Sequence, residues 1–519
     1  MSGSLAPAPL ADAHLALSAG IALWNVILAG RIARWRDAPR PIALLTALAG
    51  LLIVPALFIA VTSASLLTGR AMHSVAWVWP LTTAVIAAQA LYSVHTRRVP
   101  RLTGVPIAAY DVIVMAAALA HYALERGAAL PSPFLALVAA QATALEVGAD
   151  PATIVLPLYL YVPILAPAIS ARRRRTVLVI RGLLAGAAAA WATLVLVSLP
   201  GAIDGVRRYA RYAAERLQER SQGDFIVGLK LFPTLTGDGP TALAVTSDLD
   251  LATSMDAQAL SVYVAPGQVT LALLDSLART LDESRRGGKP LIVALDAPDD
   301  LGRSRDISAD AYLAARVAEV DRITRRLRPD YLVPGLARAG ARRRIPLARW
   351  TRYLADAAVV AHSARPRTVV VAHVPSFSPR DSALYAWAAR ASSPVDAIGF
   401  TLAPSARGAA SLDARMAAAD RWIRAARSAK PHWVLEAAGL PTIHGDRSQE
   451  RALWGALTWA TRHAEIKGVV VVEASDYEAS LGLRAPGGRV RPAAGVLERG
   501  IRALREAGTA AAATATATR

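Results

Sequence analysis

The sequence predicts two kinds of structure joined end to end: a membrane α-helical bundle of about six spans, followed by an α/β domain of the (β/α)8 TIM barrel class. Two patterns support this fold class. Long apolar runs fill the chain up to about residue 200, and from Asp224 onward short apolar runs alternate with amphipathic helical segments. The predicted parts are a transmembrane domain at 1–202, a linker helix at 203–222, a barrel at 223–508 and a disordered tail at 509–519.

The membrane prediction follows from the length of the apolar runs, because a helix needs roughly 20 apolar residues to cross the hydrocarbon core of a bilayer. The candidate spans are 10–31, 41–69, 72–95, 105–124, 152–170 and 176–199. The apolar run at 130–147 also contains two prolines, Gln141 and Glu146, so a seventh span, a re-entrant segment and an interfacial helix stay open for it.

The arginines predict how these spans are oriented. They cluster at 31–40, 97–101 and 172–175, and basic loops stay on the cytoplasmic side of a membrane. Six spans place all of these clusters on that side, whereas seven spans would place the last cluster on the opposite side. We therefore expect a multi-pass integral membrane protein, embedded in the lipid bilayer, with an extracytoplasmic C-terminal domain.

Polar residues also occur inside the predicted spans, namely Asn25, Gln89, Asp111 and His121. Ionisable groups at membrane depth are functional hypotheses, but hydrogen bonds between helices are the simpler interpretation, and no repeated polar pattern indicates a transport path. The segment 203–220 that follows the spans has the pattern of a basic amphipathic helix lying on the membrane surface, or of a solvated helical linker.

The composition excludes several classes of site. The chain has no cysteine, so disulfides and thiolate metal sites are impossible. The histidines lack the paired spacing of metal ligands, and we predict no metal and no cofactor. The net charge of +19 rests mostly on arginine, but no nucleic-acid-binding motif accompanies it, so nucleic acid is not an expected partner.

The barrel prediction rests on eight apolar runs, each with the composition of a parallel strand that is buried on both faces. These runs begin at Phe225, Ala259, Pro290, Pro329, Arg367, Pro394, His432 and Lys467. Eight strand–helix units in roughly 285 residues match the size of this barrel class. An open doubly wound sheet is the alternative, but it needs a glycine-rich phosphate loop after its first strand, and FPTLTGDGPT lacks that fingerprint.

Barrels of this class carry their chemistry at the C-terminal ends of the strands. The candidate catalytic residues are therefore the carboxylates that fall there: Asp296 after the third strand, Glu436 after the seventh and Glu473 after the eighth. The candidate substrate-binding residues are the other polar side chains at or just beyond strand ends, namely Lys230, Tyr263, His373, Asp476 and Tyr477.

One of these strands carries a recognisable motif. The segment KPHWVLEAAGLPT at 430–442 resembles the seventh-strand motif of the clan A glycoside hydrolases. The segment GVVVVEASDYEASLGLRAPGGRVRPAAGVLERGI, from Gly468, resembles the eighth strand and closing helix of the same clan. The resemblance covers most of 224–508 and implies a barrel that handles carbohydrate, with Glu436 as the catalytic nucleophile.

The sequence departs from this clan at the fourth strand. The clan places its acid/base glutamate there after an asparagine, whereas PDYLVPGLARAG puts Leu336 and Ala337 at these positions. Neither residue carries a proton for transfer. Three interpretations remain open: a hydrolase or transglycosylase whose acid is Asp296 or Glu473, a degenerate barrel that binds glycan without chemistry, and a scaffold whose acids form a satisfied polar network.

The sequence thus predicts a membrane-anchored, glycoside-hydrolase-like protein that acts on or binds an extracytoplasmic polysaccharide or other glycan. The alternative is a catalytically degenerate barrel that binds glycan or serves as a scaffold in a membrane system for polysaccharide assembly or export, with a polysaccharide synthase or export protein as partner. Whether the chain is an enzyme depends on a second catalytic carboxylate, which the sequence does not identify.

Overall fold

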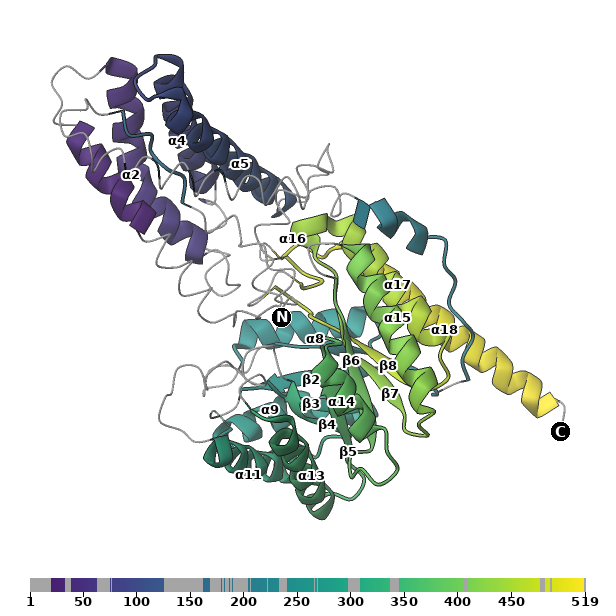
Figure 1. The fold of residues 1–519 in the computed structure, drawn as a ribbon. Coiled ribbons are helices and arrows are strands. Elements are labelled where there is room, and N and C mark those ends of the chain that lie inside the picture. The colour runs from purple at the N-terminus through teal and green to yellow at the C-terminus, as the bar shows by residue number, and fades with distance from the viewer. Residues whose placement is uncertain are drawn as a thin grey trace.

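The computed structural model covers the whole chain and is shown in Figure 1. Apart from isolated positions, it describes the residues outside 1–19, 33–38, 63–76, 126–161, 169–203, 233–239, 297–308, 337–344, 405–407, 477–480, 486–487 and 518–519.

The described N-terminal part is a helical bundle. A helix at 20–32 is followed by α2 (Arg40–Thr62), α4 (Val78–His95) and α5 (Arg101–Glu125). Helix α4 packs against both α2 and α5. Apolar side chains face outward as well as inward: Leu51 and Leu102 are 74% and 88% exposed.

The described residues bear out the membrane prediction only in part. One helical stretch, Arg101–Leu119, is long and apolar enough to cross a bilayer, and Gly20–Ile32 and Arg40–Ala56 are shorter apolar helices. The predicted span at 176–199, apart from isolated positions, and the ambiguous run at 130–147 lie outside the described residues. The described part of the chain therefore does not show about six spans.

The predicted helix at 152–170 is wrong where the structure describes it, because residues 162–168 form an extended segment buried inside the bundle. Asn25 accepts a hydrogen bond from the Leu165 backbone N–H at 2.9 Å and donates one to the Pro163 carbonyl at 2.6 Å. Gln89 likewise donates a hydrogen bond to the Ala166 carbonyl and accepts one from the Ala166 backbone N–H. The prolines of this segment prevent helical pairing, and side chains of the surrounding helices satisfy its backbone instead.

The C-terminal part is a closed barrel of eight parallel strands in sequential order. The strands are β1 (Ile226–Lys230), β2 (Ala259–Val264), β3 (Leu291–Asp296), β4 (Tyr331–Leu336), β5 (Val369–Val374), β6 (Ala397–Leu402), β7 (His432–Ala437) and β8 (Ile466–Val471). The ring closes through pairing of β1 with β8. The (β/α)8 prediction is confirmed, and the open-sheet alternative is excluded.

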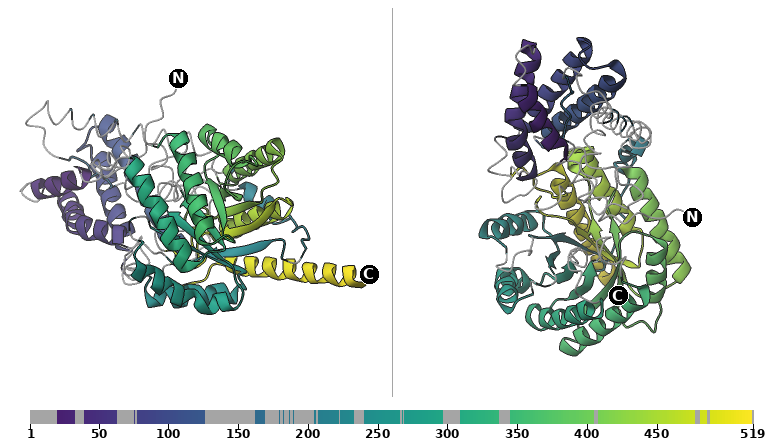
Figure 2. Two further views of the ribbon diagram at one scale, coloured as in Figure 1. Left: turned by 90° about the horizontal axis from the view of Figure 1, so that it is seen from below. Right: turned by 60° about the vertical axis from the view of Figure 1, so that its left-hand side comes forward.

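Helices surround this ring, as Figure 2 shows in two further views. They are α8 (Ala242–Ser254), α9 (Leu271–Arg286), α11 (Ala309–Leu327), α13 (Leu347–Ala364), α14 (Pro379–Ala388), α15 (Ala409–Ala426), α16 (Pro441–His444), α17 (Asp446–Thr461) and α18 (Pro492–Ala517). The predicted disordered tail at 509–519 is wrong up to Ala517, because α18 continues through it. Alanine has the highest helix propensity, and this segment is rich in it.

The linker is also different from the single helix predicted at 203–222. It is helical to about Tyr212, and residues 215–221 then run without regular structure along α17. Arg220 ends this run: its guanidinium donates hydrogen bonds to the backbone carbonyls of Thr461 and His463 and pairs with Asp224. The linker therefore belongs to the barrel rather than to a separate surface helix.

The interior of the barrel is filled by side chains from alternate positions on the strands. Trp433 lies against Tyr331, with ring centroids 4.6 Å apart, and Leu435 lies in the same cluster further along β7. Gly399 leaves room for Leu435, since a Cβ at this glycine would stand 2.2 Å from Leu435 Cδ1. The apolar interior supports a more polar layer at the C-terminal ends of the strands.

Candidate functional site

Glu436 lies in this polar layer because β7 has a bulge. Val434 pairs with Phe400 and Glu436 pairs with Thr401, so Leu435 is an extra residue in the ladder between β6 and β7. A bulge places two successive side chains on one face of a strand. Leu435 therefore packs inside the barrel, and Glu436 follows it on the same side instead of pointing towards the helices.

The Glu436 carboxylate is held by two hydroxyl groups. Thr401 donates a hydrogen bond from Oγ1 to Glu436 Oε2 at 2.6 Å, and Tyr263 donates one from its phenol to Oε1 at 3.4 Å. The side chain of Glu436 remains 20% exposed. Two neutral donors from β6 and β2 thus fix the carboxylate while leaving part of it accessible at the mouth of the barrel.

His373 extends this arrangement from β5. Its Nε2 lies 2.8 Å from Thr401 Oγ1 and 3.7 Å from Glu436 Oε2. The single hydroxyl hydrogen of Thr401 is directed at Glu436, so the hydroxyl oxygen accepts from His373 and the imidazole carries its proton on Nε2. The order of donation is therefore His373 to Thr401 to Glu436.

Glu473 has quite different surroundings. Lys230 Nζ lies 2.9 Å from Glu473 Oε2, and the two side chains are only 8% and 5% exposed. The same ammonium lies 4.4 Å from the centroid of the Tyr263 ring, a cation–π distance. The Glu473 carboxylate is thus buried and engaged by an ammonium group, and its predicted catalytic role finds no support in this geometry.

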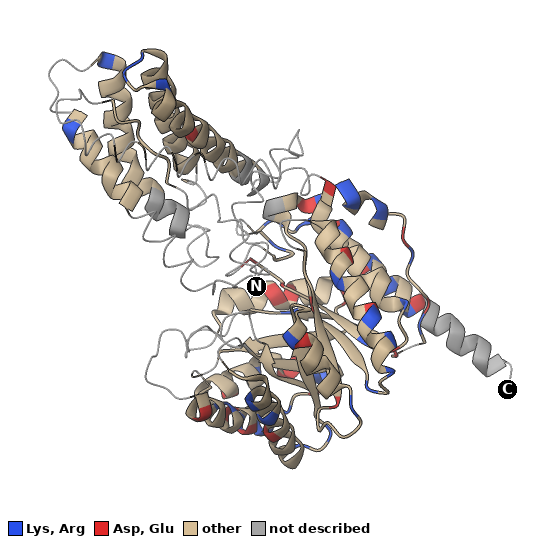
Figure 3. Cartoon of the chain, in the orientation of Figure 1, with Lys and Arg blue, Asp and Glu red and all other residues tan. Residues whose placement is uncertain are grey.

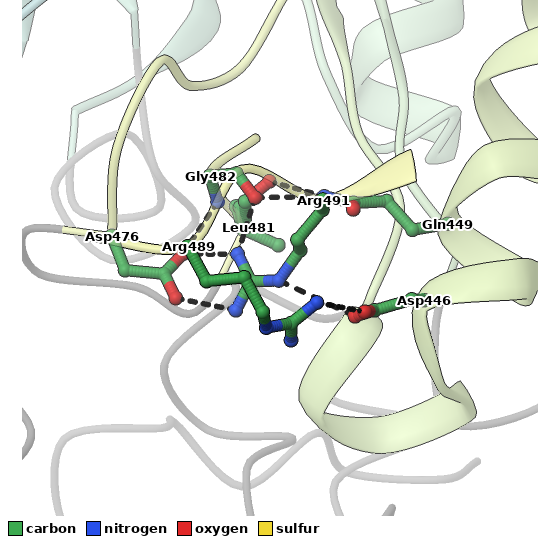
Figure 4. A network of polar contacts seen from close by, with 7 residues as sticks. All are labelled: Asp446, Gln449, Asp476, Leu481, Gly482, Arg489 and Arg491. Atoms are coloured by element: carbon green, nitrogen blue, oxygen red, sulfur yellow. Dashed lines mark hydrogen bonds and ion pairs between the residues drawn. The ribbon is translucent and has the colours of Figure 1, made fainter. Parts of the chain in front are cut away.

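Asp476 is engaged within the loop that follows β8 (Figure 4). Arg491 donates to both of its carboxylate oxygens, at 3.0 and 2.7 Å, and the Gly482 backbone N–H donates at 2.6 Å. Both side chains of the ion pair are almost fully buried. Asp476 therefore ties the loop together. Both of its carboxylate oxygens accept hydrogen bonds within the loop, and this does not support its predicted ligand-binding role.

Arg491 connects this loop to the start of α17. Its Nε lies 3.5 Å from Asp446, which also pairs with Arg489 at 2.6 Å. Gln449 of α17 donates to the carbonyls of Leu481 and Gly482 at 2.9 and 3.0 Å. Contacts from Asp446 and Gln449 of α17 thus fix the loop that follows β8, as Figure 4 shows.

The two remaining predicted residues are only partly placed. Asp296 ends β3, where its backbone pairs with Leu336 of β4, and its side chain is outside the described structure. Tyr477 lies in the undescribed segment 477–480. Leu336, at the position matched to the asparagine, is 2% exposed and packs into the barrel interior. Ala337, at the position matched to the acid/base glutamate, lies outside the described residues.

Of the sequence-predicted residues, the structure thus brings Glu436, Tyr263, His373, Lys230 and Glu473 together. The sequence analysis missed Thr401, which links two of them. The available signal was its position at the end of β6, but an isolated threonine in the run AIGFTL gives no other sign of function. Within the described residues, no group of three His, Asp or Glu side chains is arranged to hold a metal ion.

Comparisons with known proteins were made for the whole chain. No family model matches it, and no curated protein matches it. Similar solved structures include an exo-β-1,4-mannosidase from Opitutaceae bacterium strain TAV5, with 17% identity and a TM-score of 0.41, over 57% of this chain and 62% of that chain.

Two further solved structures have a similar level of likeness. A GH5_18 protein from Streptomyces cattleya in complex with Manb1-4GlcNAc has 17% identity and a TM-score of 0.42, over 54% of this chain and 81% of that chain. A GH5 xyloglucan-specific β-1,4-glucanase from a ruminal metagenomic library has 10% identity and a TM-score of 0.41, over 58% of this chain and 96% of that chain. The assignment of the fold rests on the closed ring of strands itself.

Proposed function

We propose that this protein is a membrane-anchored, glycoside-hydrolase-like protein whose barrel binds an extracytoplasmic polysaccharide or other glycan at Glu436. The observation that carries the proposal is the partly exposed Glu436 carboxylate at the C-terminal end of β7, fixed by Thr401 and Tyr263. Ionised carboxylates accept several hydrogen bonds, and a sugar carries several hydroxyl groups that can donate them. The mouth of the barrel is the usual ligand site of this fold.

Binding is favoured over hydrolysis by the state of the other carboxylates. A retaining glycosidase needs two carboxyl groups about 5–5.5 Å apart, one of which gives a proton to the leaving group. Glu473 is buried against Lys230, and Ala337 stands at the position matched to the acid/base glutamate after β4. Among the described residues of this site, Glu436 therefore has no carboxylic acid partner.

Hydrolysis is the second candidate, and the register of one strand pair favours it. The backbone of Asp296 pairs with that of Leu336, the residue before Ala337, so Asp296 stands on the strand next to the one that leads to the position of the missing acid. An acid contributed from β3 would protonate the leaving oxygen while Glu436 stabilises the positive charge that develops at the anomeric carbon.

Membrane anchoring, with the barrel outside, is supported by the distribution of charge. In Figure 3 the basic segments of the bundle lie at its end remote from the barrel. The described arginines in this part of the chain are Arg31, Arg40, Arg97, Arg98 and Arg101. Basic residues stay cytoplasmic, so this distribution fits a barrel on the opposite side of the membrane. A polysaccharide synthase or export protein is a fitting partner for a protein so placed.

The test is the substitution Glu436→Gln in the full chain, presented with a panel of β- and α-glucans, galactans and mannans. Loss of a charge-assisted hydrogen bond is worth about 1.5–3 kcal/mol, so affinity for the glycan that the wild type binds should fall at least tenfold, by the standard relation of about 1.4 kcal/mol per factor of ten. Calorimetry measures binding, and chromatography of the mixture detects any shortened product.

The matched control is Glu283→Gln, which makes the same change at an exposed glutamate of helix α9, outside the site at the mouth. It should leave affinity unchanged. Binding without product supports the binding function, and product that disappears in both Glu436→Gln and Asp296→Asn supports hydrolysis. Undiminished affinity in Glu436→Gln would contradict the proposal in either form.

A further inference from the structure

The mouth of the barrel lies on the side of the helical bundle. Helix α16 follows β7 directly, three residues after the strand that carries Glu436 ends at Ala437, and it contacts α5 of the bundle. Figure 1 shows α16 at the end of the barrel that faces the bundle. The C-terminal ends of the strands, where Glu436 is accessible, are therefore turned towards the membrane part of the protein.

The linker holds the barrel in this orientation through contacts near the mouth. Tyr209 is buried, and its hydroxyl lies 3.3 Å from His444 Nδ1 at the end of α16. Tyr212 donates to Asp413 of α15 at 2.6 Å. Its ring also lies against Gly455 of α17 so closely that a Cβ there would stand 2.7 Å away. The helical start of the linker is thus fixed on three barrel helices.

The rest of the linker continues along α17 to the opposite end of the barrel. Trp454 donates to the Glu215 carbonyl at 2.9 Å, and the Gln218 backbone N–H donates to Thr461 at 3.2 Å. Arg220 then reaches the carbonyls around the beginning of β8, including that of Ile466 at 3.1 Å. Residues 209–220 form a strap along the whole barrel wall, so the barrel is not suspended on a free tether.

The strap also limits how far the mouth stands from the bilayer. Tyr209 comes ten residues after Leu199, where the last predicted span ends. Ten residues cover at most about 35 Å when fully extended, and only about 15 Å when helical. The α16 side of the mouth is consequently held close to the membrane surface.

We infer that the ligand of the barrel is a membrane-anchored glycan, a saccharide covalently linked to a lipid, rather than a free polysaccharide in solution. This inference rests on the proposed function and on the membrane placement of the bundle. A saccharide displayed on the bilayer meets a mouth turned towards that surface, and confinement to the same membrane raises its effective concentration. A soluble chain has no such advantage and must enter between the barrel and the bilayer.

The experiment compares one set of saccharides in two forms. Oligosaccharides of glucose, galactose and mannose carry a photo-crosslinking diazirine on the sugar, and are attached either to a dialkyl lipid or to a methyl group. The full chain is reconstituted in nanodiscs that contain the lipid form, or in plain nanodiscs with the methyl form in solution at the same total concentration. The measured quantity is the fraction of protein labelled after irradiation.

The lipid form of the bound sugar should label the protein at least about tenfold more than the methyl form, because of its effective concentration at the mouth. Glu436→Gln should remove this labelling, which distinguishes occupation of the site from random collision in the bilayer. A spacer of about 20 Gly and Ser residues between Gly201 and Ala202, long enough to free the barrel from the surface, should reduce the preference and leave labelling by the methyl form unchanged.

The two hypotheses fail in different ways. Equal or stronger labelling by the methyl form, removed by Glu436→Gln, would overturn the membrane-anchored ligand and leave the glycan site in place. Persistence of the full preference in the spacer variant would also overturn it, because proximity of the mouth to the bilayer would then have no role. Absence of Glu436-dependent labelling with both forms would remove the proposed function itself.

Discussion

Glu436 and Glu473 stand near the ends of adjacent strands but have different surroundings. Glu436 accepts hydrogen bonds from neutral hydroxyls and keeps an exposed edge. Glu473 is buried and pairs with an ammonium group. Tyr263 lies between them, since its ring faces Lys230 and its hydroxyl reaches Glu436. The first carboxylate thus remains partly accessible, and the second is buried in an ion pair.

The Lys230–Glu473 pair leads to a prediction about stability. Lys230→Met should lower the free energy of unfolding by about 3–5 kcal/mol, because it leaves a buried carboxylate without its counter-charge. The double variant Lys230→Met with Glu473→Gln removes that charge and should recover part of the loss. Urea unfolding of the full chain, followed by tryptophan fluorescence, measures the loss in the double variant and in each single variant, Lys230→Met and Glu473→Gln. If the loss of unfolding free energy in the double variant equals the sum of the losses in the two single variants, the pair does not act as a unit.

His432 leads to a prediction about pH. Its Nε2 lies 3.0 Å from the Tyr385 hydroxyl, and burial lowers the pKa of its imidazole from 6.5 to about 4. Between these values the unfolded chain binds a proton that the folded chain does not. The stabilising contribution is therefore present above pH 6.5 and is lost as the pH falls to 4, to a total of about 3 kcal/mol.

His432→Gln keeps a polar partner for Tyr385 but does not titrate in this range. Its unfolding free energy should therefore change less between pH 6.5 and pH 4 than that of the wild type. Urea midpoints measured at several pH values across this interval make the comparison. Parallel curves for the two proteins would show that His432 does not control the acid sensitivity of the barrel.

At the level of elements, the extended segment at 162–168 depends on side chains of the helices around it. Asp111 of α5 accepts a hydrogen bond from the Ile164 backbone N–H at 2.8 Å, and Tyr110 donates to the Val162 carbonyl at 3.2 Å. Buried backbone outside helices and sheets needs other protein groups to satisfy its N–H and C=O groups. Asn25, Gln89 and Asp111 thus have a structural role as backbone partners.

This arrangement predicts that Asp111→Leu destabilises the bundle by about 1–3 kcal/mol, since the Ile164 N–H is left buried without its acceptor. Asp111→Asn retains an acceptor oxygen of the same reach and should have a much smaller effect. Thermal unfolding in detergent micelles, followed by circular dichroism of the helices, compares the two variants. Equal losses in both would mean that the charge of Asp111, rather than its hydrogen bond, stabilises the segment.

At the scale of the whole molecule, the proposed topology places the α4–α5 loop and the barrel on opposite sides of a membrane. The chain has no cysteine, so single cysteines give unambiguous labelling. Arg98→Cys marks the exposed α4–α5 loop, and Ala425→Cys marks the exposed end of α15. In intact cells a membrane-impermeant maleimide should label the second variant and reach the first only after permeabilisation. Labelling of both, or the reverse order, would contradict the topology.

The sequence by itself determined the architecture of the C-terminal part. Each strand begins within a few residues of a predicted apolar run, because a strand buried on both faces must be apolar along its whole length. The same rule located the strand ends, and with them Glu436, Tyr263 and His373, since the carboxyl ends of parallel strands share one edge. The N-terminal part was predictable only as apolar helices, because hydropathy indicates the length of an apolar run but not where its helix is interrupted.

Only the tertiary structure decided which of these residues work together. Closure of the ring brings Lys230 to Glu473, which are 243 residues apart in the chain, and no local pattern records such a pairing. The strap at 209–220 likewise depends on contacts between distant segments, and the bulge that turns Glu436 inward depends on the pairing of β7 with β6. Local composition sets which faces are buried, whereas the identity of each partner follows from packing of the complete chain.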